Sequence, residues 1–464
     1  MLHAAIDLGG SSGRVTVGEL VDQKIVLTEL HRFKHEPIQN NDGLFWDWQF
    51  ILEQIKIGLN KAVELGQVAT VGVDSWAVDY GLIDQKGELL APPHCYRDGR
   101  TDGVMAKLKN ELGVDYIYSK TGIQFIFFNT MYQLFVEKNS PIYKGADKFL
   151  MVPDLINYLL CGSISTEITN ASTTQLLNVH TQDWDWELIE KLGIKTSLFA
   201  KINKPGVQVG EIKGHGKLDA IKVISVGSHD TASAVAGAPL GEDGLTAYIS
   251  SGTWSLVGLE LTKPVTDKKA MEFNITNEMG VDDRIRFIKN VAGMWLLEES
   301  LDYWASKGEH YTAAELAKAA AELPRGAVID ANDPIFEKPG AMPERIAMLC
   351  EKSNQKVPRS PAAYARCIFD SLADAYVKVL GQLQSAANVK INAINIVGGG
   401  SANRLLNQLT ADVTGLPVYA GPSEATVLGS IMVQMQSVGL IKSLAQGRVI
   451  IKNSITQEVF KPRG

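Results

Sequence analysis

Apolar and polar residues alternate near the start of the chain, which is the pattern of β-strands with one buried face. Residues 4–8 form a short apolar run that Asp7 interrupts, and residues 15–20 and 24–30 alternate. The small residues 9–13 separate the first run from the second. We therefore predict a strand that turns back into a β-hairpin, whereas a Walker A loop or a Rossmann fingerprint would open a helix.

A similar pattern begins the second half of the chain. Residues 245–250 are typical of a strand, small and hydroxyl residues follow at 250–253, and residues 254–258 are again strand-like. The similarity is too short to demonstrate a repeat. Residues 237–244 have the Gly, Pro and acidic composition of a linker. We therefore expect an N-terminal domain of residues 1–243 and a C-terminal domain of residues 244–464.

Strands and helices are interleaved in both halves. Residues 69–74 and 393–397 are apolar runs that end in loops, and residues 364–386 and 403–414 have helical periodicity. This order predicts an α/β fold. We expect the segment after Gly439 to be peripheral.

Composition limits the class of protein. The chain has 464 residues, 45% of them hydrophobic and 21% charged, which is typical of a globular enzyme with two domains. A net charge of −7 disfavours binding to nucleic acid, and no run approaches the roughly 18 apolar residues of a membrane helix. We expect a cytoplasmic protein without nucleic-acid or membrane partners, either a monomer or a small homo-oligomer.

The four cysteines lack the spacing of a metal site. Cys350 and Cys367 lie near enough in sequence to form a disulfide. Buried thiols are the interpretation that we favour for a cytoplasmic protein.

The loop from Gly9 to Arg14 is the first candidate site. Its small residues allow backbone N–H groups to approach a phosphate closely. Asp7, at the end of the preceding strand, suits a hydrated Mg²⁺, and Arg14 can neutralise phosphate oxygens. The alternative is an ordinary Gly/Ser hairpin turn.

Two further loops are candidates for the same ligand. Residues 250–253 form a second hydroxyl-rich turn, which could hold a polyphosphate together with the first loop. Gly398, Gly399 and Gly400 follow a strand and precede a helix, where a flat ligand such as adenosine could approach the backbone. The alternative for the triple glycine is a tight strand-to-helix connection.

Asp230 is the strongest catalytic candidate. A strand at 223–226 ends just before it, and a helix of small residues begins beside it. The helix N-terminus stabilises the aspartate as an anion, although a simple N-cap is the alternative. His229 is more typical of a hydrogen-bonding histidine than of a metal ligand. We expect His31 and His35 to be exposed to solvent.

Asp74, Trp76 and Asp79 lie on a loop after an apolar strand. Carboxylates and tryptophan together suit a polyol, through hydroxyl bonding and stacking on the C–H face. The alternative is a core tryptophan with exposed acids. Residues 96–100 similarly offer sugar ligands or a surface ion pair.

The chain contains no G-x-x-x-x-G-K-[ST], G-x-G-x-x-G, G-x-S-x-G or H-E-x-x-H motif, which argues against P-loop, dehydrogenase, hydrolase and zincin classes. Instead its motifs resemble those of the FGGY carbohydrate kinases, in the superfamily of actin, hexokinase and heat-shock-chaperone ATPases. The resemblance runs from residue 4 to about residue 440. It is carried by residues 6–14, 45–47, 73–81, 96–100, 122–125, 128–130, 228–231, 250–254, 274–278, 289–297 and 397–400.

The resemblance implies two ribonuclease-H-like lobes, the actin-like ATPase fold, with ATP and a sugar in the cleft between them. It implies Asp230 as general base and Mg²⁺ held near Asp7. By matching positions, the implied ATP-binding residues are Gly10, Ser11, Ser12, Gly13, Arg14, Thr253, Asn290, Glu298 and Gly399. The implied sugar-binding residues are Ala77, His229, Asp230 and Thr231, beside the candidates Asp74, Trp76 and Asp79.

Two positions depart from the pattern, because Ala77 replaces a usual glycine and Glu298 a usual glutamine. The implied reaction is transfer of a phosphoryl group from ATP to the 1-hydroxyl of L-rhamnulose. Alternatives are another ketose, such as L-fuculose or a pentulose, or a nucleotide-gated actin-like or chaperone-like ATPase or sugar sensor.

Overall fold

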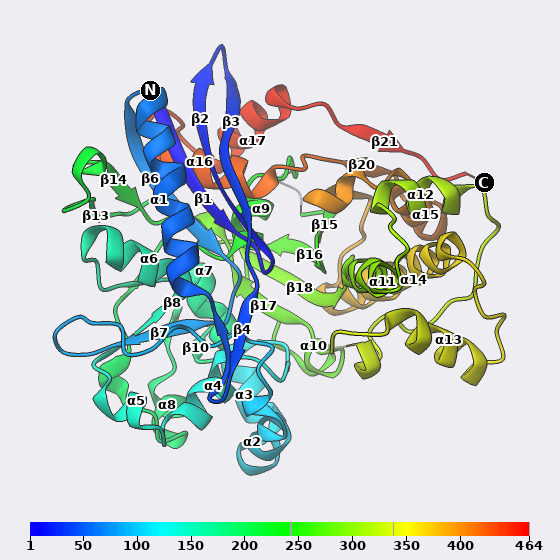
Figure 1. Cartoon of the computed structure of the whole chain (residues 1–464), viewed down its shortest axis with the longest axis horizontal. Helices are drawn as coiled ribbons and strands as arrows, with labels where there is room; N and C mark the ends of the chain where they lie inside the picture. The colour runs from blue at the N-terminus through cyan, green and yellow to red at the C-terminus, as the bar shows by residue number, and fades with distance from the viewer. Residues whose placement is uncertain (242–243, 337, 464) are drawn as a thin grey trace. The chain divides into compact units, whose positions relative to one another are not determined.

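The computed structural model describes residues 1–241, 244–336 and 338–463. The chain forms two compact units, drawn in Figure 1. Unit 1 comprises Met1–Pro239, Glu260–Phe287 and Ala425–Ser454, and unit 2 comprises Leu240–Leu259, Ile288–Glu424 and Ile455–Gly464. Glu242 and Asp243, in the expected linker, lie outside the described residues, so the boundary after residue 243 stays a prediction.

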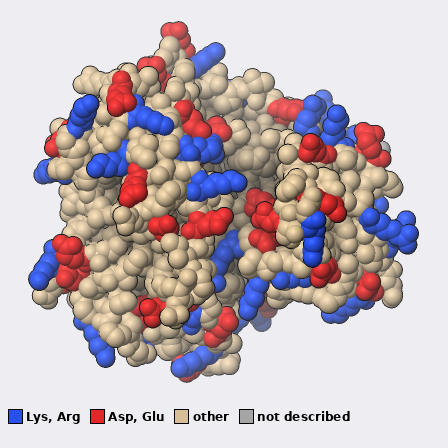
Figure 2. Space-filling model, in the orientation of Figure 1, with Lys and Arg blue, Asp and Glu red and all other residues tan. Residues whose placement is uncertain are grey.

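Acidic and basic side chains are interspersed on the face drawn in Figure 2, in keeping with the small net charge for a chain of this length. Within the described residues, no helix is both long enough and apolar enough to span a membrane. The four cysteines are free thiols, and Cys350 and Cys367 are buried. Burial raises the pKa of the Cys367 thiol to about 12, so it stays protonated.

Unit 1 is built on a six-stranded sheet in the order β13-β14-β6-β1-β2-β3. β1 pairs antiparallel with β2 and parallel with β6, and β14 continues the parallel part. The predicted hairpin is confirmed. The strands are β1 (Leu2–Leu8), β2 (Ser12–Val21), β3 (Lys24–Lys34), β6 (Val68–Ser75), β13 (Gln208–Glu211) and β14 (Lys222–Ile224).

A second, seven-stranded sheet repeats this arrangement around β15 of unit 2. β15 pairs antiparallel with β16 and parallel with β19, and β19 pairs parallel with β20. The full order is β17-β18-β16-β15-β19-β20-β21. The strands are β15 (Thr246–Ser251), β16 (Trp254–Leu261), β17 (Thr276–Met279), β18 (Ile285–Ala292), β19 (Ala393–Val397), β20 (Val418–Ala420) and β21 (Glu458–Phe460). The similarity of residues 1–20 to 245–258 is therefore a similarity of structure.

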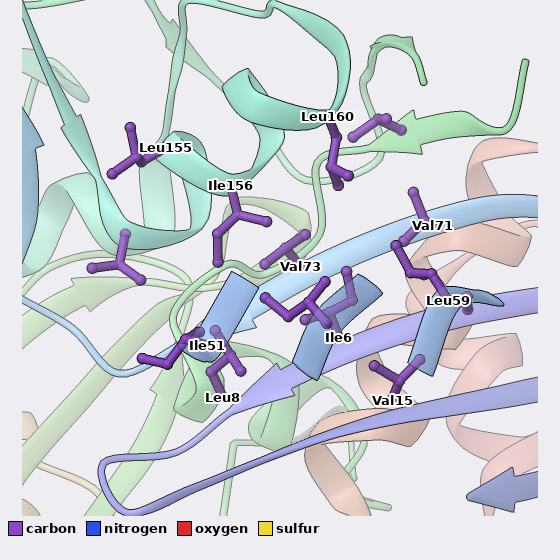
Figure 3. Packing of buried hydrophobic residues seen from close by; sticks show 14 of the residues in the cluster. Ile6, Leu8, Val15, Ile51, Leu59, Val71, Val73, Leu155, Ile156 and Leu160 are labelled. Atoms are coloured by element: carbon purple, nitrogen blue, oxygen red, sulfur yellow. The ribbon is translucent and has the colours of Figure 1, made fainter. Parts of the chain in front are cut away.

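One hydrophobic cluster of unit 1 lies on the face of its sheet where alternate residues of β1 pack against α1 (Trp48–Leu65) and α6 (Val152–Cys161). Figure 3 shows Ile6 and Leu8 among Ile51, Leu59 and Ile156. Because side chains alternate across a strand, Asp7 lies on the opposite face from Ile6 and Leu8. Burial of Ile6 and Leu8 against the helices therefore determines that the side chain of Asp7 points to the other face of the sheet.

Two helices, α9 (Asp230–Ala236) and α16 (Ala425–Ser437), cross in close contact within unit 1. A Cβ on Gly429 would lie 1.9 Å from the Ser233 carbonyl oxygen, and one on Gly237 would lie 2.1 Å from that of Ala425. Only glycine permits such backbone approach. The crossing therefore sets the position of α9 and of Asp230 at its start.

The chain after Gly439 is not peripheral, contrary to expectation. α17 (Leu444–Ser454) contributes Arg448, only 4% exposed, which makes a bidentate ion pair with Glu260 at 2.8 Å. Arg448 also donates to the carbonyl oxygen of Val235 in α9. The amphipathic pattern of this helix is short, which is why its burial was not predicted.

Of the remaining helices, α14 and α15 match the predicted segments 364–386 and 403–414, and the others were not predicted individually. In unit 2 they are α11 (Trp295–Ser306), α12 (Ala313–Ala321), α13 (Met342–Lys352), α14 (Pro361–Ala387) and α15 (Arg404–Thr414). In unit 1 they are α2 (Val104–Leu112), α3 (Val114–Thr121), α4 (Thr130–Glu137), α5 (Pro141–Gly145), α7 (Ile168–Ala171), α8 (Trp186–Lys191) and α10 (Lys268–Glu272). Short two-stranded ladders join β4 (Pro37–Asn40) to β5 (Gly43–Trp46), β7 (Tyr80–Ile83) to β8 (Lys148–Met151), β9 (Thr166–Glu167) to β12 (Ile202–Asn203), and β10 (Leu177–Asn178) to β11 (Asp183–Trp184).

Replacement of Gly429 by Ala should lower the stability of unit 1, because the new methyl group would overlap backbone atoms of α9. We expect a loss of about 1–3 kcal/mol or more, as for other overpacked cores. Gly381 in α14 is a matched control, since a Cβ there meets no atom within 4 Å. Gly381→Ala should stabilise by about 0.5–1 kcal/mol. Calorimetric Tm values measure both, and an unchanged Tm for Gly429→Ala would contradict the close crossing.

Candidate active site

Three aspartates approach one another on the polar face of the unit 1 sheet. Asp7 on β1 and Asp74 on β6 are partners in the strand register, and Asp230 is the first residue of α9. Asp74 is completely buried, whereas the Asp230 side chain keeps 29% exposure. Burial, the charges of Asp7 and Asp230 and a hydrogen bond with Asp7 raise the pKa of Asp74 well above its usual value. Asp74 is therefore a neutral acid beside two carboxylates.

Arg14 compensates the charge of Asp7. The two residues face each other in the β1–β2 ladder, and Nε and NH2 of Arg14 lie 2.8 and 2.7 Å from Oδ2 of Asp7. Such a two-point pair fixes the arginine as well as neutralising the acid. From the sequence we predicted that Asp7 lies near a metal ion and that Arg14 contacts phosphate. The structure shows that the two side chains form an ion pair with each other.

The loop after β1 is a tight turn. The Gly9 N–H donates to the Ser12 carbonyl oxygen at 2.8 Å, while Gly10 and Ser11 are exposed. Gly13 is required by packing, since a Cβ there would lie 2.4 Å from the Phe33 ring. The loop therefore presents exposed backbone on a rigid base, as an anion site needs.

His35 is buried and forms a hydrogen bond to this loop, so the prediction that it is exposed was wrong. It is 3% exposed, and its Nε2 lies 2.9 Å from the carbonyl oxygen of Gly9. Burial lowers the pKa of His35, so the ring is neutral at pH 7 and Nε2–H is the donor. The ring also lies beside Trp46 and Trp76.

Asp79 is buried in the centre of a tryptophan cluster. Its Oδ2 accepts hydrogen bonds from Nε1 of Trp46 at 2.7 Å, Nε1 of Trp76 at 3.0 Å and the backbone N–H of Tyr96 at 3.1 Å. Its Oδ1 accepts one from Gln133 at 3.2 Å. Burial outweighs these bonds and raises the pKa of Asp79 to about 6. Asp79 therefore orients the two indole rings, and neither it nor Asp74 is an exposed acid.

The turn between Trp76 and Asp79 is strained. Val78 has a φ of 66°, which is rare for a β-branched residue. Its carbonyl oxygen accepts a hydrogen bond from Thr130 at 2.7 Å, which holds the turn in place. Ala77, half-buried, precedes this turn, and strain of this kind gathers at functional sites.

The segment 96–100 contributes Arg100 to a largely buried ion pair with Glu137, not to an ion pair on the surface. Arg100, whose side chain is 13% exposed, contacts Glu137 at 2.5 Å and Gln133 at 2.7 Å. Arg97 lies over the ring of Tyr96. The segment thus supports the tryptophan cluster through Tyr96.

Asp230 is held at the start of α9 by its neighbours. The N–H and hydroxyl of Thr231 donate to Oδ1 of Asp230 at 2.5 and 3.1 Å, and Nε2 of His229 lies 3.4 Å from the same oxygen. Burial raises the pKa of Asp230, and His229 opposes this shift. Asp230 is therefore a positioned carboxylate with a basicity above that of a free aspartate, which suits proton abstraction.

Buried charges beneath this loop were missed by sequence reasoning. Glu167 accepts hydrogen bonds from the N–H and hydroxyl of Ser228 at 3.0 and 2.6 Å. Glu278 and Arg286 lie against His229. No local signal marks them, because a glutamate or arginine in a short polar strand has the composition of an exposed residue.

Unit 2 contains a cavity of about 800 Å³, within the usual size range for a small-molecule site. Gly398, with a φ of 80°, and Gly400, whose Cβ would lie 2.0 Å from Oγ of Ser251, bring its two loops together. Thr253 donates to Glu298 at 3.4 Å, whereas Asn290 lies on β18. The predicted residues that line the cavity are Glu298 and Gly399, with Gly252 and Gly400 beside them.

The described side chains contain no group of three or more His, Cys, Asp and Glu that could ligate an ion directly. Asp7 nevertheless offers hard carboxylate oxygen, the ligand type that Mg²⁺ prefers, beside the exposed loop. The residues fit an ion that is held largely through water.

The chain belongs to the FGGY family of carbohydrate kinases. The N-terminal domain of that family matches residues 2–237, and its C-terminal domain matches residues 247–438. The chain is 44% identical to a rhamnulokinase of Mannheimia succiniciproducens over 99% of this chain and 95% of that protein. It is 43% identical to a rhamnulokinase of Bacillus subtilis over 100% of this chain and 96% of that protein.

Solved structures show the same fold at low identity. A ligand-bound xylulose kinase from Lactobacillus acidophilus has a TM-score of 0.81 at 18% identity, over 100% of this chain and 94% of that one. A glycerol kinase with ADP from Plasmodium falciparum has a TM-score of 0.78 at 15% identity, with the same coverage. The predicted two-lobed α/β fold is confirmed.

His35→Phe should loosen the loop from Gly9 to Gly13, because phenylalanine fills the space but cannot donate to the Gly9 carbonyl. His35→Gln, which keeps a donor, is the matched control. We expect faster amide hydrogen exchange in the loop for the Phe variant, with the Gln variant nearer the parent. Equal exchange in the three proteins would show that this hydrogen bond does not hold the loop.

Proposed function

We propose that this kinase transfers the γ-phosphoryl group of ATP to the 1-hydroxyl of L-rhamnulose, in the breakdown of L-rhamnose. The products are L-rhamnulose 1-phosphate and ADP. The full-length similarity to curated rhamnulokinases supports the sugar. The observation that carries the chemistry is the position of Asp230, a part-exposed carboxylate at the start of α9 beside Asp7 and the phosphate-loop candidate.

Asp230 is the general base in this proposal. The sugar oxygen forms a bond to the γ-phosphorus as the bond to ADP breaks, and the hydroxyl proton passes to Asp230. The raised pKa of Asp230 favours acceptance of that proton, and the Thr231 bonds keep the carboxylate oriented. His229, Thr231 and the backbone at Ala77 would contact the sugar.

The phosphates would be held by Gly10, Ser11, Ser12, Gly13 and Arg14. Thr253, Asn290, Glu298 and Gly399 would contact the nucleotide in unit 2. The cavity at Glu298 and Gly399 supports this assignment. Glu298 can accept but not donate when ionised, so it suits a nucleotide hydroxyl or amino group.

Mg²⁺ would bind near Asp7, through water, and neutralise charge on the transferring phosphates. Asp7 remains fixed for this role by Arg14. The neutral Asp74 adds no further negative charge beside the phosphates.

Trp76 and Asp79 would act together in sugar binding. Asp79 is completely buried, so we assign it the orientation of the Trp46 and Trp76 rings rather than a sugar contact. Ala77 would narrow the pocket by one methyl group relative to the glycine usual in this family. In this proposal residues 1–243 bind the sugar and supply the first phosphate loop, and residues 244–464 bind the nucleotide.

Asp230→Asn should keep ATP binding but lose sugar phosphorylation by about 10²–10⁴-fold, the usual contribution of a general base. A coupled ADP-release assay with L-rhamnulose measures the rate, and calorimetry measures nucleotide affinity. Near-normal turnover of the variant would rule out Asp230 as the base.

The same assay across a panel of ketoses and aldoses tests the substrate. We expect L-rhamnulose to give the highest kcat/KM. A higher value for L-fuculose or a pentulose would change the assigned sugar, and ADP release independent of sugar would favour a nucleotide-gated ATPase.

A further inference from the structure

His229 lies against a buried polar network whose other members, Arg286 and Glu278, have no part in the proposed reaction. Arg286, on β18, is 0% exposed and has its NH1 3.1 Å from Nδ1 of His229. The Arg286 Nε donates to the Met279 carbonyl oxygen at 2.9 Å, and NH2 donates to that of Thr169 at 3.3 Å. Three points of its guanidinium are therefore fixed.

Glu278, on β17, neutralises Arg286. Its Oε2 lies 3.0 Å from NH1 of Arg286 and 3.2 Å from Nδ1 of His229. Burial opposes ionisation, yet the neighbouring charge of Arg286 and the contact with His229 hold the pKa of Glu278 below its usual value. Glu278 is thus an anion paired with a buried cation.

The chemistry of arginine indicates which ring nitrogen of His229 carries the proton. A guanidinium nitrogen only donates, and arginine does not deprotonate in proteins. In the 3.1 Å contact between NH1 of Arg286 and Nδ1 of His229 the histidine nitrogen is therefore the acceptor, which puts the ring proton on Nε2. That nitrogen lies 3.4 Å from Oδ1 of Asp230.

We propose that Arg286 is a positioning residue, which fixes His229 in the Nε2–H tautomer so that the ring donates toward Asp230 and keeps it a carboxylate. The catalytic effect of this positioning rests on the proposed role of Asp230 as base. The tautomer itself does not. The competing arrangement has a proton on Nδ1 that donates to Glu278 at 3.2 Å; it would set that N–H against the NH1 donor of Arg286, whether or not Nε2 is also protonated.

Several charged groups act on Asp230 at once. Asp7 on β1 and Asp74 on β6 lie on one side, and Arg14 on β2 is paired with Asp7. Glu278 on β17 and Arg286 on β18 lie behind His229, and Glu167 on β9 holds Ser228. Burial and Asp7 raise the pKa of Asp230, His229 and Thr231 lower it, and Arg286 acts on it through its contact with His229.

The direct test is a long-range ¹H–¹⁵N spectrum of the full chain labelled at histidine, which distinguishes a protonated from an unprotonated ring nitrogen. The variant His229→Asn assigns the signal. We expect proton on Nε2 and none on Nδ1, unchanged in Glu278→Gln. A wild-type ring with its proton on Nδ1 would overturn the proposal, whether or not L-rhamnulose is the substrate.

The kinetic test uses Arg286→Lys, whose single ammonium group cannot make all the bonds of the fork. We expect kcat to fall about 10- to 100-fold, as for other residues that orient a functional group, with the KM for ATP unchanged. The acidic limb of the pH profile should move to higher pH, because Asp230 loses a donor.

Arg448→Lys is the matched control, since Arg448 is also buried and also pairs with a carboxylate and a backbone carbonyl. It should lower Tm but leave the pH profile and the His229 signal unchanged. If Arg286→Lys lowers only Tm in the same way, Arg286 is structural and the proposal fails. Activity of Asp230→Asn with the Nε2–H tautomer intact would instead reject the proposed base alone.

Discussion

The burial of aspartate charge at the ends of β1, β6 and α9 is the constraint on which the rest of unit 1 depends. Asp7 and Asp74 are neighbours in a parallel ladder, and α9 adds Asp230. Like charges this close and this buried are tolerated only when one is neutral or paired. Both solutions are present, because Asp74 keeps a proton and Arg14 pairs with Asp7.

This constraint explains features that lie far from the aspartates in sequence. The glycine crossing of α9 with α16 sets the position of α9, which carries Asp230 as its first residue. His35 fixes the loop that follows Asp7, and the cluster around Asp79 fixes the loop that follows Asp74. The backbone that carries each carboxylate is therefore held by contacts from other elements, as a preorganised site requires.

Much of this arrangement could be predicted from the sequence. The hairpin after Asp7, its counterpart at β15 and β16, and the helix after Asn403 follow from local alternation and turn residues. That loops from the two halves hold one nucleotide stays a prediction. Periodicity alone could not supply this pairing, because it carries no information on which loops meet.

The errors have a physical cause in each case. His35 was expected to be exposed, because its neighbours in sequence do not reveal that its side chain contacts the carbonyl oxygen of Gly9. Asp74 and Asp79 were read as accessible acids, although both are buried. Arg286 is 57 residues from His229, and only the fold brings them together. Buried polar networks depend on tertiary partners, which short motifs do not encode.

The most direct measurement of the central claim is the identity of the product. Incubation of the protein with ATP, Mg²⁺ and L-rhamnulose, followed by ³¹P and ¹³C NMR, should show one phosphate ester at carbon 1 and an equal amount of ADP. Inorganic phosphate without a sugar ester, or an ester at another carbon, would contradict the account.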